Sequence, residues 1–323
     1  MSRSIENEIS KIACVIVAYN NGDNIEKLLE TLLTQSRPIE EIIVVDNASS
    51  DGTPQMIRQN SPQVTLMVNA SNIGVGGGYA QGMEYAHQKG YEWIWLLDGD
   101  SLPRTSALEE LAKAFTSLSS AHPKIGILAS SPVTPLTNER YDGFLWRGRF
   151  VRLPKEPAQC QKPFRVDSVI SSGCLVSRRV IEGVGLPRAD FFMDFVDHEY
   201  NLRVCHGGYE IVYVPNSIIY HHIGKPRVVK SRIVRAIARL ATKSPVTAQP
   251  PWRAYYEVRN ELYTFWHEFR NYKALFFVSL HIIRMIGGML LFNDKEKVKR
   301  MNYIIRGLRD GFKGKLGRIV APE

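Results

Sequence analysis

Two carboxylates, Asp98 and Asp100, follow an apolar run and are separated only by glycine, in the stretch WIWLLDGDSLP (93–103). The apolar residues 93–97 have the composition of a buried strand, so both acids are expected at its end. Two carboxylates this close repel each other unless a positive group lies between them, and a divalent cation meets that need. Because Asp-Gly is also a common turn dipeptide, a turn with two solvated acids is the alternative.

Polar and glycine-rich residues follow three further predicted strands. These strands span 12–18, 41–46 and 64–68, and predicted helices at 24–35 and 78–90 alternate with strands. The alternation predicts an α/β fold with a mostly parallel sheet, helices on both faces, and ligands beyond the carboxyl ends of the strands. The residues after these strands are Ala18-Tyr19-Asn20, Asp46-Asn47 and NASNIGVGGG (69–78). With the two acids, they predict a site for a polar ligand and a cation.

The glycine-rich stretch does not match a known phosphate-binding pattern. Its spacing is not G-x-G-x-x-G, and it follows the third strand rather than the first. Its glycines allow either close approach of a ligand or close packing of the helix that comes next.

Residues 104–228 add a second group of polar side chains. Asp197 begins a segment that reads as helical from Val196 to Val204, and it is either a general base or only a helix cap. The stretch EIVYVPNSIIYHHIG (210–224) predicts two short strands around Pro215, followed by His221 and His222. A neutral imidazole can complete a Mn²⁺ or Mg²⁺ shell built mainly of oxygen ligands.

Charge is unevenly distributed along the 323 residues, which have a net charge of +9. Residues 225–323 contain 21 basic and 7 acidic side chains, a net charge of +14. Such a segment favours anionic lipid, a phosphate-bearing substrate or nucleic acid as a partner, and a solvated basic surface is the alternative. The four cysteines form no CxxC pair, which favours a reducing compartment without structural zinc. No apolar stretch opens the chain, so we expect no signal peptide.

Residues 274–292 are apolar enough to span a bilayer, but His281 and Arg284 lie near the middle of this segment. We therefore favour a helix in the membrane interface, with a helix packed in the core as the alternative. Basic clusters at 295–300 and 306–318 suit anionic lipid.

The ordered motifs of residues 12–224 resemble the family-2 nucleotide-sugar glycosyltransferases of the GT-A fold, in particular bacterial rhamnosyltransferases and galactofuranosyltransferases of surface-polysaccharide synthesis. The motifs are VIVAYN, VVDNASSDGT, NIGVGGGYAQG, LLDGDSLP and FFMDFVDHEYNLR with the later IIYHH. The resemblance implies a GT-A domain at 1–228, with a nucleotide-binding half at about 1–103 and an acceptor half at about 104–228. Residues 229–323 then form a helical, membrane-associating or acceptor-binding region.

The resemblance also implies a role for each matching residue. Asp197 falls at the position of the catalytic base, while Asp98, Asp100 and His221, or His222 in its place, would bind the metal. The nucleotide sugar would be bound by Ala18, Tyr19, Asn20, Asp46, Asn72, Gly74, Gly78 and Asp98. Glu199 and Arg203 would either support the helix that carries Asp197 or contact the acceptor. Further acceptor or phosphate contacts are expected from Lys225, Arg227, Tyr256 and Arg259. Two departures from the family are Gly99 between the two acids and Val196, where an acid often precedes the base.

The implied reaction is a metal-dependent, inverting transfer from a nucleoside-diphosphate sugar to a hydroxyl of a glycan or polyprenyl-diphosphate-linked acceptor. It would take place in the cytoplasm, at the inner face of the membrane. One alternative is a nucleotidyltransferase acting on a sugar phosphate, which would favour a basic glycine-rich loop after the first strand. Another is a nucleic-acid-binding protein using the basic tail, but this leaves Asp98 and Asp100 unexplained, and no aromatic residues for base stacking are interleaved with the basic ones.

Overall fold

The computed structural model describes residues 9–135, 138–141, 143–152, 161–221, 225–226, 247–291 and 296–320. The chain forms two compact units. The first comprises the described parts of 1–189 and 196–222, and the second comprises 190–195 and the described parts of 223–323. The sequence placed a boundary after residue 228, whereas the structure divides the chain at 222–223 and adds the short segment 190–195 to the second unit.

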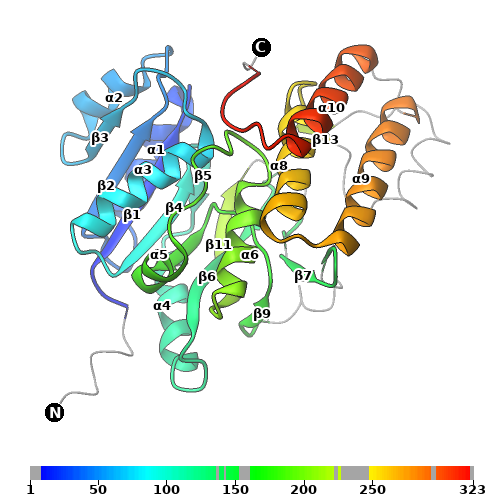
Figure 1. The fold of residues 1–323 in the computed structure, drawn as a ribbon. Helices are drawn as coiled ribbons and strands as arrows, with labels where there is room; N and C mark the ends of the chain where they lie inside the picture. Colours follow the sequence, from blue (N-terminus) through cyan, green and yellow to red (C-terminus); the bar gives the residue numbers. More distant parts are fainter. Residues whose placement is uncertain are drawn as a thin grey trace. The chain divides into compact units, whose positions relative to one another are not determined.

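A nine-stranded mixed sheet forms the centre of the first unit (Figure 1). Its strands are β1 (Ile12–Ala18), β2 (Glu41–Asp46), β3 (Thr65–Val68), β4 (Trp93–Asp98), β5 (Ser101–Pro103), β6 (Ile125–Val133), β9 (Phe164–Val166), β10 (Cys174–Ser177) and β11 (Glu210–His221). The order is β3-β2-β1-β4-β10-β6-β11-β5, and β9 also pairs with β11. Strands β3, β2, β1 and β4 are parallel, as are β6 and β11, whereas β10, β5 and β9 pair antiparallel with their neighbours.

Helices cover both faces of this sheet, as the alternating pattern predicted. They are α1 (Gly22–Leu33), α2 (Thr53–Asn60), α3 (Gly74–Gln88), α4 (Ala107–Leu118), α5 (Arg178–Val184) and α6 (Val196–His206). Cys14 and Ile16 of β1 belong to a core with α1, α2 and α4, and Ala13 and Val15 belong to a second core with α3, α5 and α6. Because successive strand side chains point to opposite faces, one apolar strand supports two cores.

Residues 74–78 of the glycine-rich stretch form the first turn of α3, whereas the sequence predicted a helix that begins only at residue 78. Its glycines allow this helix to pack closely on β1. A Cβ atom at Gly78 would lie 2.8 Å from Val17, and one at Gly82 would lie 2.3 Å from Val15. These distances are shorter than carbon atoms tolerate, so close packing accounts for both glycines.

Residues 210–221 also differ from the expectation of two short strands around Pro215. They form the single strand β11, whose register against β6 shifts between Val214 and Ile218. The shift absorbs the proline, which donates no ladder hydrogen bond. Residues 144–152 form a hairpin of β7 (Phe144–Trp146) and β8 (Phe150–Arg152).

The second unit is mainly helical in its described residues. It contains α8 (Arg253–Tyr263), which continues as the π-helix η2 (Thr264–Glu268), α9 (Tyr272–Leu291), α10 (Lys297–Phe312), and a short antiparallel pair of β12 (Lys225–Pro226) and β13 (Thr247–Ala248) (Figure 1). Aromatic residues dominate its core, which contains Phe192, Trp252, Tyr255, Tyr256 and Tyr303. Phe192 explains why 190–195 belongs to this unit.

Helix α9 has one buried and one exposed apolar face. Ala274, Val278, Ile282 and Met289 are buried, whereas Tyr272, Phe276, Leu280, Ile283 and Leu290 are exposed. His281 lies at the edge of the buried face, where its nitrogens contact Glu261 at 2.7 Å and Glu257 at 3.4 Å on α8. By length and composition, this helix is able to cross a membrane.

Candidate active site

Asp98, Asp100 and His221 converge at one edge of the sheet. Asp98 ends β4, Asp100 lies in the turn before β5, and His221 ends β11. One ligand atom from each of the three residues lies within 4.8 Å of the others. The His221 Nδ1 atom is 3.3 Å from Asp100 Oδ1, and Nε2 is 3.8 Å from Asp98 Oδ2. The structure therefore brings together the three residues that the sequence proposed as metal ligands.

Strand pairing and two buried serines hold His221 in this position. Strand β5 runs antiparallel to β11, with Ser101 opposite His221. The Ser101 hydroxyl is 2.8 Å from His221 Nδ1 and 2.7 Å from the hydroxyl of Ser172. Ser172 in turn accepts a hydrogen bond of 3.0 Å from the backbone N–H of Asp98. The two serines thus link two of the three proposed ligands.

Sequence reasoning missed both serines. Ser172 is 71 residues from Ser101, and isolated serines carry no pattern that indicates such a pairing. The feature that could have pointed to Ser101 is its place directly after Asp100, on a strand too short to be recognised.

The electrostatics of the cluster favour a bound cation. Burial raises the pKa of Asp98, the charge of His221 lowers it, and the negative charges of Asp100 and Asp197 raise it further, so that the net shift is upward. Burial opposes a charged His221, but a hydrogen bond to Asp100 and the charges of both acids outweigh it and raise the histidine's pKa. The site therefore concentrates negative charge that a positive partner stabilises.

Tyr79 of α3 fixes the orientation of Asp98. Its hydroxyl donates a hydrogen bond of 2.8 Å to Asp98 Oδ1, and its ring is buried. Burial, followed by the charge of Asp98, raises the pKa of Tyr79 well above its ordinary value, so the hydroxyl stays protonated and acts as a donor.

Gly99 has a steric reason for its place between the two acids. A Cβ atom at this position would lie 2.5 Å from Oδ1 of Asn21. The same Asn21 oxygen accepts a hydrogen bond of 2.8 Å from the backbone of Tyr19. Asn21 therefore occupies the space that a side chain at position 99 would need, which accounts for the first departure from the family pattern.

The proposed nucleotide-binding residues lie at the carboxyl ends of β1 and β2 and at the start of α3. Ala18 is buried and Tyr19 is exposed, and Asn20 adopts a left-handed conformation with φ 53°. Asp46 is fully buried, and its Oδ2 accepts a hydrogen bond of 2.9 Å from Ser49. Asn72 accepts a hydrogen bond of 2.8 Å from the backbone of Gly74.

Asp197 lies in the first turn of α6, half-buried. Its charge acts on Asp98, so it belongs to the same electrostatic site. Glu199 is fully buried two residues later and forms an ion pair with Arg203, which also donates to the carbonyls of Val184 and Leu186. Glu199 and Arg203 therefore support the helix, which is the first of the two roles that the sequence allowed.

The other residues expected to contact the acceptor differ in where they lie. Tyr256 and Arg259 are fully buried in the second unit, where Tyr256 donates to the carbonyl of Val320 and Arg259 to that of Gly317. Because both side chains are buried, neither is accessible to an acceptor, and the expectation that they contact it is wrong. The side chain of Lys225, together with Arg227 and His222, lies outside the described residues.

The donor set of the site fits a hard divalent cation. Two carboxylates and one imidazole nitrogen are close enough to share one ion, and this mixture of oxygen and nitrogen donors suits Mn²⁺ or Mg²⁺. A zinc site would be expected to contain more nitrogen or sulfur ligands.

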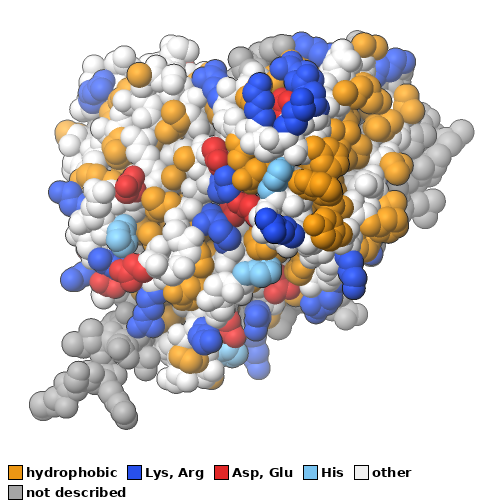
Figure 2. Space-filling model, in the orientation of Figure 1, with side chains coloured by type: hydrophobic (Ala, Val, Ile, Leu, Met, Phe, Trp, Pro, Cys, Tyr) orange, Lys and Arg blue, Asp and Glu red, His pale blue; other side chains and the backbone are white. Residues whose placement is uncertain are grey.

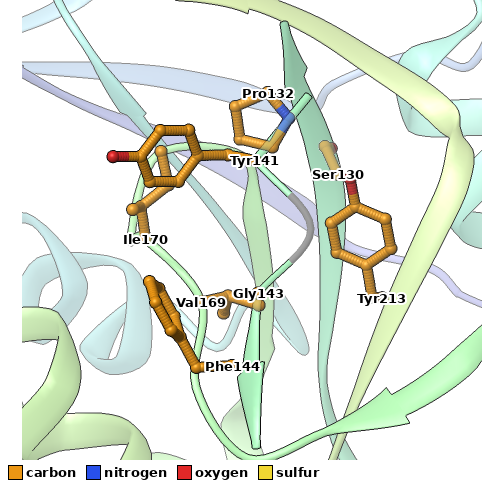
Figure 3. A pocket seen from close by; sticks show the side chains of 8 residues that line it. All are labelled: Ser130, Pro132, Tyr141, Gly143, Phe144, Val169, Ile170 and Tyr213. Carbon is orange, nitrogen blue, oxygen red and sulfur yellow. The ribbon is translucent and has the colours of Figure 1, made fainter. Parts of the chain in front are cut away.

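A small cavity lies elsewhere in the first unit, beside the hairpin of β7 and β8 (Figure 3). Its volume is about 10 Å³, room for about one water molecule. Phe144, Tyr141 and Ile170 lie on one side of it, and Ser130 and Tyr213 on the other. It is too small to hold a nucleotide sugar.

Comparisons with known proteins agree with this geometry. The chain is 27% identical to the dTDP-rhamnosyl transferase RfbF of Shigella flexneri over 95% of its own length and 97% of the relative's. It is 28% identical to the N-acetylglucosaminyl-diphospho-decaprenol L-rhamnosyltransferase of Mycobacterium tuberculosis, over 64% of this chain and 75% of that one.

A solved structure and a family model identify the fold and the family of the chain. The crystal structure of GalNAc-T7 with UDP, GalNAc and Mn²⁺ matches 95% of this chain and 56% of its own, with a TM-score of 0.57 and 15% identity, a likeness of fold alone. The family model described as glycosyl transferase family 2 matches residues 13–185, more than half of the chain. The protein therefore has the GT-A fold and belongs to glycosyl transferase family 2.

Proposed function

We propose that this enzyme transfers a rhamnosyl residue from a dTDP-linked donor, with inversion, to a hydroxyl of a diphosphate-linked glycan acceptor in surface-polysaccharide synthesis. The convergence of Asp98, Asp100 and His221 beside Asp197 carries the proposal. Likeness to the two rhamnosyltransferases favours the sugar, and the name of the second favours the acceptor class. Galactofuranosyl transfer from a UDP-linked donor is the other member of the donor class to be tested.

Asp98, Asp100 and His221 would hold the divalent cation, which supplies positive charge against the departing nucleoside diphosphate. A hydrogen bond from Tyr79 fixes the orientation of the Asp98 carboxylate, and a hydrogen bond with Ser101 fixes the orientation of the His221 imidazole. Asp197 accepts the proton of the acceptor hydroxyl as that oxygen attacks the sugar carbon from the face opposite the leaving group. One base and direct displacement invert the configuration, without the second carboxylate nucleophile of retaining hydrolases.

The nucleotide base would bind at Asp46. Within the described part of the chain, the buried Oδ1 of this residue has no hydrogen-bond partner. A buried carboxylate oxygen without a partner is costly, and the ring N–H of thymine or uracil is a donor that satisfies it. Ala18, Tyr19, Asn20, Asn72 and the first turn of α3 would border the base and ribose.

A donor screen tests the reaction. Purified protein with Mn²⁺ or Mg²⁺ is incubated with N-acetylglucosaminyl diphosphate on an alkyl chain as the acceptor and with dTDP-rhamnose, UDP-galactofuranose or another nucleotide sugar as the donor. Released nucleoside diphosphate and the glycosylated acceptor are measured. Asp100→Asn should abolish release and Mn²⁺ binding, whereas Asp197→Asn should abolish transfer and leave donor and Mn²⁺ binding within about twofold. If no donor yields nucleoside diphosphate, or if Asp197→Asn remains active, the proposed reaction is refuted.

Contact with the cytoplasmic face of an anionic membrane would bring the enzyme to a lipid-linked acceptor. The exposed apolar face of α9 supports this proposal, since it carries Phe276, Ile283 and Leu290 with the exposed cations Lys273 and Arg284 beside them. Figure 2 shows hydrophobic side chains gathered over the C-terminal part of the chain, with Lys and Arg side chains nearby. Apolar side chains flanked by cations are typical of helices that lie in the membrane interface.

Vesicle flotation with the full chain tests this contact. Phe276→Ser/Ile283→Ser should lose binding to vesicles containing phosphatidylglycerol, whereas Leu33→Ser, at an exposed leucine of α1, should not. Undiminished binding of the double variant would refute the role of α9.

A further inference from the structure

Three aromatic rings of the β7–β8 hairpin pack together with His198 at the start of α6. The rings of Trp146 and Phe150 are 4.9 Å apart, and Phe150 stacks on His198 at 4.5 Å. Phe144 meets the edge of His198 at 5.4 Å. We call these four residues the hairpin aromatic cluster, and all of them are partly exposed. The cluster ends at the residue that directly follows Asp197.

Ser168 joins the hairpin and α6 into one block. Its backbone exchanges hydrogen bonds of 2.7 and 3.0 Å with Phe144, and its hydroxyl is 2.7 Å from His198 Nδ1. Ser168 is fully buried. A second link runs from the Asn201 amide of α6 to the carbonyl of Val169, at 2.7 Å. These bonds fix the hairpin and its cluster relative to α6, the helix that carries Asp197.

A sugar bound by the cluster has to lie outside the cavity beside it. The cavity beside Phe144 holds about 10 Å³, too little for a sugar ring (Figure 3). Such a sugar would contact the partly exposed portions of these side chains. Aromatic faces carry partial negative charge, which attracts the C–H groups on the flat side of a pyranose ring.

The tip of the hairpin carries positive charge. Arg147 and Arg149 are both exposed there, on either side of Gly148, whose φ of 73° makes the turn. Guanidinium groups bind phosphate oxygens with paired hydrogen bonds. An aromatic surface and two arginines in one short hairpin match a ligand that has a sugar ring and a phosphate.

We infer that the β7–β8 hairpin is the acceptor site: the sugar of the acceptor stacks on the hairpin aromatic cluster, and its diphosphate binds Arg147 and Arg149. The inference rests on the proposed function, because it assigns the acceptor a place beside the base Asp197. It also assigns separate roles within the hairpin, since the rings recognise the sugar and the arginines recognise the diphosphate.

Two probes separate these contributions in NMR titrations of the full chain. One is N-acetylglucosamine joined through diphosphate to a short alkyl chain, and the other is its methyl glycoside, which has no phosphate. Trp146→Ala should weaken binding of both probes about five- to tenfold, and Trp146→Phe should restore most of it. Arg147→Ala/Arg149→Ala should weaken only the diphosphate probe, about tenfold, and less so in 0.5 M NaCl. The matched control is Arg58→Ala/Lys113→Ala, which removes two exposed cations from α2 and α4.

The readouts separate acceptor binding from folding and from donor chemistry. Donor hydrolysis in water and donor KM should match the wild type in the hairpin variants, which shows that they fold, while acceptor KM rises. Unchanged affinity of Trp146→Ala for both probes overturns the inference, as does a loss of donor hydrolysis equal to the loss of acceptor binding. A wild-type chain that binds both probes through the hairpin but releases no nucleoside diphosphate would refute the proposed function and leave the hairpin site standing.

Discussion

Replacing Ser101 with alanine tests whether the buried serines position the proposed metal ligand His221. The substitution removes one hydrogen bond of 2.8 Å to His221 Nδ1 and one of 2.7 Å to Ser172. Each buried hydrogen bond contributes about 1 kcal/mol to stability, so we expect a loss of about 2 kcal/mol in unfolding free energy. Loss of a group that orients a metal ligand also lowers metal affinity, by about 10- to 100-fold.

Ser217 offers a matched control in the same sheet. Like Ser101 it is fully buried with two partners, the hydroxyl of Ser130 and the carbonyl of Ala107, each at 2.8 Å. Ser217→Ala should therefore cost about the same stability, about 2 kcal/mol, without changing the metal site. Comparison of the two variants separates folding from metal positioning.

Mn²⁺ binding, followed by electron paramagnetic resonance in the presence of nucleoside diphosphate, measures the difference. We expect the dissociation constant to rise about tenfold or more in Ser101→Ala and to stay within about twofold in Ser217→Ala. Equal Mn²⁺ affinity in the two variants would show that the serine network contributes stability only.

Two further predictions concern packing and charge. Gly82→Ala should destabilise the protein by about 1–3 kcal/mol in chemical unfolding, because the new Cβ atom would lie 2.3 Å from Val15 of β1. Gly287→Ala in α9, where a Cβ atom would have no neighbour within 4 Å, should be neutral or slightly stabilising. Equal effects of the two substitutions would contradict the packing argument. Burial opposes the charge of His281, but hydrogen bonds to Glu257 and Glu261 outweigh it and raise its pKa from 6.5 to about 10. The stabilisation by charged His281 is therefore complete below about pH 6.5 and is lost as pH rises through 10, by about 2 kcal/mol after allowance for solvent screening. His281→Asn should remove this pH dependence of the unfolding free energy. An unchanged pH dependence in the variant would exclude the ion pair.

The order of strands and helices in the first unit was readable from the sequence because hydrophobic periodicity is local. The ends of β1, β2 and β4 were placed within about one residue. Asp98 and Asp100 stood out for the same reason, since both follow directly after an apolar run. His221 was proposed from its place at the end of a predicted strand and from likeness to a family, whereas its pairing with Ser101, 120 residues away, became visible only in the structure.

Tertiary contacts decided what local pattern does not encode. Gly78 was open to two interpretations until the distance between its Cβ position and Val17 of β1 gave a reason in packing. Tyr256 and Arg259 had the chemistry of ligand contacts, and only their burial in an aromatic core excludes that role. A side chain's type and spacing thus fix what chemistry it can perform, whereas the residues that surround it in the folded chain determine whether solvent, a ligand or the protein itself satisfies it.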